Sequence, residues 1–217
     1  NKFDEIGQLY LMVPELLESR SHYRGFLSRK VVSRVSIVDI EYGFKVFIFV
    51  KNMSDELISG LCSVNCLRLK DSLFSDSDWS RTYYKHNNNL FSYLDSTFHS
   101  RSEIGHAPDF HRITFTGKNL NMKVSPSFWS KWSITDNSSD DGIMAVVSSC
   151  EEKSMVIMFE DSYSLQSCRR EKWRCIHSNS FFGDIEPGVE IEKCGFVLML
   201  PYSVKKCWPM MEDFNNV

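Results

Sequence analysis

The feature that most constrains the fold is a pair of strand-forming runs joined by a short turn. Residues 31–40 read VVSRVSIVDI and residues 44–50 read FKVFIFV. β-branched and aromatic side chains pack well on a pleated surface and therefore favour strands. Glu41-Tyr42-Gly43 between the runs is typical of a turn. We predict a β-hairpin whose second strand is covered on both faces.

Strand signals recur along the chain. Cys62, Val64 and Cys66 alternate with Ser63 and Asn65, which is the period of a strand, and this strand ends near Lys70. Further strand-like runs cover residues 111–116, 120–124, 143–148, 154–159 and 189–200. Seven to nine strands without alternating helices predict one all-β domain over residues 1–217, a β-sandwich of the jelly-roll or Ig-like kind.

Two segments are expected to depart from this pattern. Apolar residues between Phe3 and Leu17 follow helical spacing, and Pro14 interrupts it, so residues 1–24 are predicted as a short helical or irregular start. Residues 71–109 are rich in Ser, Asp, Asn and His and are predicted as a long polar insertion with short elements, such as one at 90–98.

Composition narrows the class of protein. The formal net charge is −3 and no basic stripe is visible, which argues against nucleic-acid binding. No run of about 18 apolar residues is present, so no membrane span is expected. Seven cysteines without the spacing of a disulfide scaffold favour a reducing, cytoplasmic (including nucleocytoplasmic) location. The sequons at Asn52 and Asn137 fit a secreted protein equally well.

The residues give no clear catalytic or metal signature. Cys62 and Cys66 would lie about 13 Å apart along one strand, too far to share a zinc ion. Cys168 and Cys175 with His177 are a second candidate. Cys175 and His177 fall on one side of a strand, where they form either a ligand pair or an edge pair. We predict no catalytic residues, no metal and no cofactor.

Cys194 alternates in phase with Phe196 and Leu198, which predicts a buried structural thiol rather than a nucleophile. Glu190 and Glu192 share that phase, so a bulge or twist is expected near Gly195.

Aromatic side chains within the polar stretches are the candidate binding residues. They either cover one end of the sandwich or anchor a partner. The candidates are Trp79, Tyr83, Tyr84, Phe91, Trp129 and Trp132.

The C-terminal part of the chain carries a family resemblance. It reads Cys175-Ile176-His177, then Phe181-Phe182, then the run from Pro187-Gly188 to Cys194-Gly195-Phe196. This resembles the last two strands of the C-terminal jelly-roll/Ig-like domain that follows the leucine-rich repeats in plant TIR-type NLR immune receptors. The Pro-x-Trp-Phe opening of that family is missing here.

The resemblance implies a non-enzymatic protein-recognition module of plant defence, an immune-receptor domain that binds a pathogen effector protein. The oligomeric state stays open. The alternatives are a carbohydrate-binding or viral/host interaction sandwich, and a thiol hydrolase that uses Cys175 or Cys194 with His177.

Overall fold

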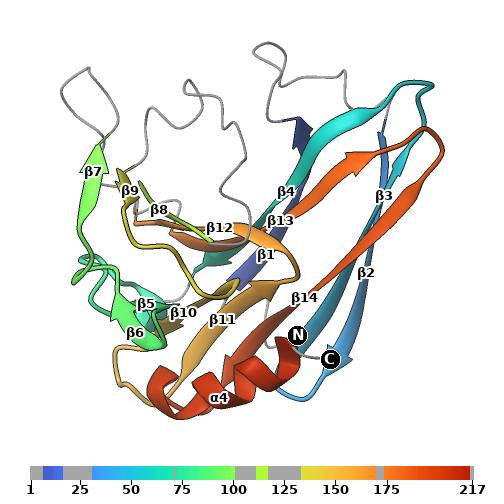
Figure 1. Ribbon diagram of the computed structural model, residues 1–217. Helices are drawn as coiled ribbons and strands as arrows, with labels where there is room; N and C mark the ends of the chain where they lie inside the picture. Colours follow the sequence, from blue (N-terminus) through green and yellow to red (C-terminus); the bar gives the residue numbers. More distant parts are fainter. Residues whose placement is uncertain are drawn as a thin grey trace.

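The computed structural model describes residues 7–16, 31–70, 72–100, 111–116, 133–169 and 174–215, the first of these ranges by its backbone. These residues form two seven-stranded sheets that pack face to face, as Figure 1 shows. The predicted all-β sandwich is confirmed. Fourteen strands are described, more than the seven to nine expected, because several strands are short or polar.

Sheet I contains, in spatial order, β1 (Gly7–Leu16), β4 (Ile58–Leu69), β13 (Cys175–Ile185), β12 (Ser162–Cys168), β8 (His111–Phe115), β9 (Ser133–Thr135) and β7 (Phe98–Ser100). Sheet II contains β2 (Val31–Ile40), β3 (Gly43–Asn52), β14 (Glu190–Leu200), β11 (Ser154–Phe159), β10 (Ile143–Val147), β5 (Thr82–His86) and β6 (Asn89–Ser92). Every neighbouring pair is antiparallel except β8 and β9. A 3₁₀ turn, η1 (Ser72–Phe74), and a helix, α4 (Val204–Asn215), complete the described elements.

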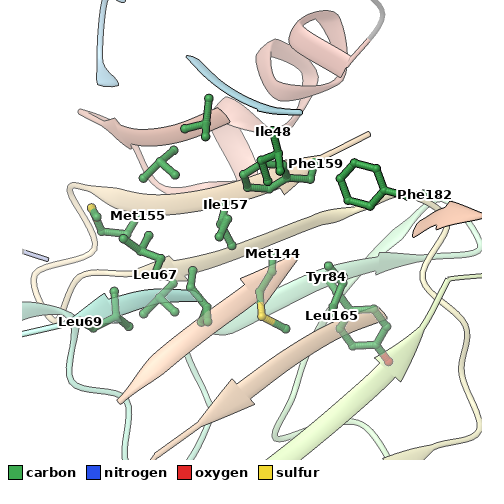
Figure 2. Packing of buried hydrophobic residues seen from close by; sticks show 14 of the residues in the cluster. Ile48, Leu67, Leu69, Tyr84, Met144, Met155, Ile157, Phe159, Leu165 and Phe182 are labelled. Atoms are coloured by element: carbon green, nitrogen blue, oxygen red, sulfur yellow. The ribbon is translucent and has the colours of Figure 1, made fainter. Parts of the chain in front are cut away.

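The main core lies between the sheets. Leu67 and Leu165 of sheet I meet Ile157 and other side chains of sheet II in one buried cluster, part of which Figure 2 shows. Burial of apolar surface of this kind is the main favourable contribution to folding. The alternation of each strand directs one set of side chains into this layer and the other set to an outer face.

A second apolar cluster covers the outer face of sheet II. Helix α4 lies across β14, β11 and β10 (Figure 1) and contributes Val204, Cys207 and Trp208, among others, to this cluster. The central strands of sheet II are therefore apolar on both faces. This explains why β10 and β11 read as continuous runs of buried residues.

The hairpin of β13 and β14 contains the predicted Pro-Gly turn. The amide of Val189 donates to the carbonyl of Glu186 at 3.1 Å, and Gly188 has a φ of 77°. Pro187 in the second position and a positive φ in the third define a type II turn, which favours glycine there. The hairpin is anchored to β3 because the Gly188 amide donates to the Asn52 carbonyl at 2.9 Å.

The N-terminal helix is the clearest wrong prediction. Residues 7–16 form the edge strand β1, which pairs with β4, and the register shifts between Met12 and Glu15. Pro14 lies in that irregularity, and an edge strand or a bulge tolerates the missing N–H of proline. Pairing with β4 therefore prevails over the local helical spacing.

The predicted polar insertion 71–109 also needs correction. Its described part, 72–100, supplies β5 and β6 to sheet II and β7 to sheet I. The β5–β6 hairpin turns through Asn87 and Asn88, both with positive φ. Asparagine tolerates this conformation, which a two-residue type I′ hairpin turn requires.

Candidate functional site

Two of the predicted binding aromatics lie in the core. Trp79 and Tyr84 are almost completely buried, so they offer no exposed surface that could anchor a partner. The Trp79 indole donates to Ser167 Oγ at 3.1 Å, and the guanidinium of Arg112 lies 4.0 Å from the centre of its ring. The Tyr84 hydroxyl is 2.9 Å from Ser96 Oγ. Both rings fill the end of the sandwich, which is the covering role that was the alternative to binding.

The other candidates keep some surface or cannot be placed. Tyr83 and Phe91 are partly buried and pack against the two apolar clusters from the β5–β6 hairpin. Trp129 and Trp132 lie outside the described residues. A role in partner binding therefore stays a prediction for these four side chains.

Cys194 is buried, as predicted. It packs with Phe196 and Leu198 in the cluster beneath α4, and burial raises the pKa of its thiol. The expected bulge is absent among the paired residues, because the register of β14 against β3 runs without a shift from Glu190 to Leu198. The change from exposed Glu190 to buried Cys194 follows from where α4 covers the sheet.

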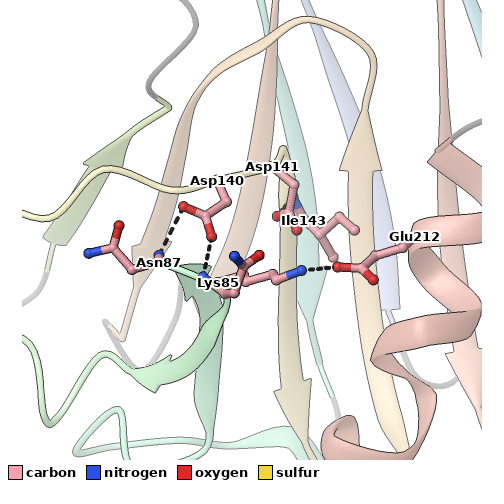
Figure 3. Close-up of polar contacts among 7 residues, drawn as sticks. Lys85, Asn87, Asp140, Asp141, Ile143 and Glu212 are labelled. Atoms are coloured by element: carbon pink, nitrogen blue, oxygen red, sulfur yellow. Dashed lines mark hydrogen bonds and ion pairs between the residues drawn. The ribbon is translucent and has the colours of Figure 1, made fainter.

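A pocket rich in carboxylates lies at one end of the sandwich, but internal contacts occupy its acids. Asp140 accepts the amide N–H groups of Asn87 and Asn88 at 3.0 and 2.8 Å, and thereby fixes the β5–β6 turn. Lys85 beside it pairs with Glu212 of α4, as Figure 3 shows. These contacts hold the β5–β6 hairpin and α4 on the sandwich.

Asp141 lies beside this hairpin and has a perturbed carboxyl group. Its Oδ1 accepts the amide of Ile143 at 3.0 Å. Burial is the largest influence and raises its pKa from 3.8 to about 6, although the Ile143 amide and the charge of Lys85 act in the opposite direction. Desolvation disfavours the charged form of a carboxyl group.

Strand β2 carries an exposed apolar surface. This strand is at the edge of sheet II, so one side of its backbone has no neighbouring strand among the described residues. Eight consecutive residues, 32–39, are exposed. Four of them are large and apolar, between 41% and 54% exposed: Val32, Val35, Ile37 and Val38.

The apolar surface extends beyond the start of β2. Val31 pairs with Asn52 of β3, and the exposed Met53 and Leu57 follow in the next loop. Exposed Val189 is close by, because the Asn52 amide donates to its carbonyl at 3.0 Å. Long, flat, apolar edge strands are rarely left open, because their free N–H and C=O groups pair readily with another strand.

A cluster of thiols and imidazole occupies the outer face of sheet I. Cys66 of β4 lies directly opposite His177 of β13, and Cys175 of β13 lies directly opposite Cys168 of β12. Cys175 and His177 are two residues apart and so project from the same face. Register therefore brings four candidate ligands from three neighbouring strands together. We call these four residues the Cys-His cluster.

The distances among three members of the cluster, Cys66, Cys175 and His177, are short. Cys175 Sγ is 3.0 Å from His177 Nε2, and the ligand atoms of Cys66, Cys175 and His177 all lie within 4.8 Å of one another. The hydrogen bond to Cys175 and the nearby imidazole lower the pKa of Cys66. Hydrogen bonds to Cys168 and Cys66 raise the pKa of Cys175 well above its ordinary value.

Only part of this cluster can be predicted from the sequence. The Cys-x-His spacing at 175–177 identified one pair, since two residues on a strand share a face. In the sequence, Cys66 is paired with Cys62 as a possible ligand. The structure places Cys62 in a different apolar group with Ile113 and Tyr163. The register between β4 and β13, strands more than a hundred residues apart, has no local signal in the sequence.

Comparison with known proteins places the chain in no family. No family model matches it, and no curated protein sequence matches it. One solved structure, the Slr1438 protein from Synechocystis sp. PCC 6803, is similar with a TM-score of 0.45 and 6% identity over 78% of this chain and 54% of that chain. This chain thus spans about half the length of that protein, and a likeness this weak carries no functional argument. No described helix is long and apolar enough to cross a membrane.

Proposed function

We propose that this domain is a non-enzymatic protein-recognition module that binds by strand addition at β2. The observation that carries the proposal is the edge of sheet II at β2, which no other described strand covers and where a ten-residue strand exposes apolar side chains on both faces. In strand addition, the backbone of a partner strand supplies the missing hydrogen bonds, and alternate side chains give specificity.

The occupant that best fits this edge is a second copy of β2. Two antiparallel copies related by a two-fold axis at Ser36 keep inner-face residues opposite inner-face residues. In this register Val35 of one copy faces Ile37 of the other, and Ser33 faces Asp39. Apolar pairs and hydrogen-bonded pairs across strands are both stabilising.

The charges of β2 are compatible with the same register. Arg34 faces Val38 of the second copy, so no two like charges are directly opposite. Arg34 also lies 3.8 Å from Glu190 of its own chain, which balances its charge. A contact limited to two edge strands is smaller than the roughly 1,200 Å² of a stable interface. We therefore expect weak, concentration-dependent association.

The test is the molar mass in solution over a wide range of protein concentration, measured by sedimentation velocity. The wild type should dimerise as the concentration rises. Val35→Lys and Ile37→Glu should each weaken the dimer, and a mixture of the two variants should restore it, because the new charges face each other in this register. Leu94→Lys is the matched control, since Leu94 is an equally exposed apolar residue elsewhere.

A wild type that stays monomeric at every concentration would refute self-recognition, as would dimers that Val35→Lys leaves unchanged. The resemblance to the plant receptor domain predicts a pathogen effector as the partner. If an effector binds the monomeric wild type and Ile37→Glu equally, strand addition at β2 is wrong for that partner too.

A further inference from the structure

We propose that the Cys-His cluster binds one Zn²⁺ ion through the thiolates of Cys66, Cys168 and Cys175 and the imidazole of His177. The site is on sheet I, away from β2, so this inference is independent of strand addition. It also differs from the expectation of no metal that the sequence alone gave.

The ligand types and number fit zinc. Structural zinc sites are four-coordinate and tetrahedral, and three cysteines with one histidine is a common set. Soft thiolate and imidazole ligands together favour zinc over magnesium or calcium, which prefer oxygen. The cluster offers four such ligands from three adjacent strands.

The spacing fits as well. Zn–S and Zn–N bonds of about 2.3 and 2.0 Å place tetrahedral ligand atoms roughly 3.5–3.8 Å apart. The atoms of Cys66, Cys175 and His177 lie within 4.8 Å of one another, and the Cys175–His177 pair is at 3.0 Å. Zinc binding would therefore draw the more distant of these atoms about 1 Å closer. Cys168 is the natural fourth ligand, because it faces Cys175 and already hydrogen-bonds to that thiol.

The two ring nitrogens of His177 have different surroundings. His177 is 7% exposed, and its Nδ1 is buried without a hydrogen-bond partner among the described residues. Nε2 is the nitrogen that faces Cys175, so it is the atom that would bind the ion, and Nδ1 would remain the donor for a hydrogen-bond acceptor.

The charge balance is acceptable. Binding requires the three thiols to lose their protons, so zinc with three thiolates and a neutral imidazole carries a net charge of −1. Arg68 lies directly opposite Cys175 in the β4–β13 register and brings a positive charge beside the site. The ion would hold β4, β13 and β12 together, because its ligands come from all three strands.

The competing fate of these cysteines is a disulfide. Cys168 and Cys175 face each other across β12 and β13, and Cys66 is close to Cys175. Only one disulfide can form among three cysteines, and it would remove two of the four ligands. The two outcomes are therefore mutually exclusive and can be separated by experiment.

The test uses the full chain, purified with a reducing agent and without chelator. Metal analysis should find zinc equimolar with protein. Titration of the metal-free protein with Co²⁺ should give the visible d–d bands of a tetrahedral ion and the near-ultraviolet bands of thiolate-to-cobalt charge transfer. Cys66→Ala and His177→Ala should each lose the bound zinc. Cys62→Ala, on the same strand and face but four residues away, should retain it.

The cobalt titration needs only the wild type, so it decides the question even if a variant fails to fold. A wild type that gives no charge-transfer band would overturn the proposal. Full zinc content in Cys66→Ala would do the same, and so would a disulfide between any two of the three cysteines that persists in the folded protein purified with a reducing agent.

Discussion

The packing of Gly195 against β11 gives a prediction whose size can be derived from the structure. Gly195 lies directly opposite Phe159, and a Cβ atom added to it would be 2.2 Å from the ring and 2.6 Å from the Met158 carbonyl oxygen. Carbon atoms in contact are about 3.5–4.0 Å apart, so the ring would have to move by more than roughly 1 Å. Phe159 is fully buried in the main core and has little room to do so.

We expect Gly195→Ala to lower the free energy of unfolding by about 2–4 kcal/mol. Overpacking of a core costs about 1–3 kcal/mol, and the Met158 carbonyl is backbone that cannot rotate away. The sign is informative, because a strand glycine is otherwise destabilising relative to alanine by about 0.5–1 kcal/mol. The melting temperature of a chain of this size should fall by about 5–15 °C.

Urea denaturation of a double-mutant cycle with Phe159→Leu would assign the cause. The smaller side chain leaves space for the new methyl group, so Gly195→Ala should cost at least about 1 kcal/mol less in the Phe159→Leu background. If Gly195→Ala is neutral in the wild type, or if the two changes are simply additive, the close approach between Gly195 and Phe159 is not what requires glycine.

Two further predictions concern Cys194 and Asp141. Cys194→Ser places a hydroxyl in an apolar cluster, where an unpaired hydroxyl costs about 1–3 kcal/mol. The variant should therefore destabilise the fold at least as much as Cys194→Ala does. Melting temperatures that are unchanged in both variants would contradict this. Asp141 holds its proton more tightly in the folded state, because its pKa rises from 3.8 to about 6. Its contribution to stability is therefore present at low pH and is lost as the pH rises from about 4 to about 6, a fall of up to about 3 kcal/mol. Unfolding measured across this range should show Asp141→Asn gaining stability relative to the wild type as the pH rises, and a constant difference would show that the carboxyl is not desolvated.

The elements that the sequence predicts best are those whose local and tertiary preferences agree. The β2–β3 hairpin and the final strand β14 follow from β-branched alternation and turn residues, and both are present with nearly the expected bounds. Strand β12 reads SYSLQSC, in which Tyr163 and Leu165 alternate with polar residues only briefly, yet all seven residues are buried. Its polar side chains are satisfied by neighbours in space, for example Asn179, which donates to Ser164 Oγ at 3.0 Å.

Helix α4 and the Cys-His cluster were harder to predict for different reasons. Pro209 lies inside α4 and would normally mark a break, but packing on sheet II stabilises the helix around it. The cluster depends on cross-strand register, which a chain specifies through turns and core packing far from the ligands. Cys168, Cys175 and His177 were therefore visible in the sequence as a candidate, whereas the approach of Cys66 to them was not.

The order of strands within the sheets has a consequence for how the chain folds. Both central pairings, β4 with β13 and β3 with β14, join the first third of the described chain to its last part. Neither sheet can form completely until strands more than a hundred residues apart have paired. The long chain segments between them lose conformational entropy before any native contact compensates for it. We expect folding on the slow timescale of β-sandwiches, about milliseconds to seconds. Partly folded forms would expose the edges of β3 and β4, and such unpaired edges make folding intermediates prone to aggregate.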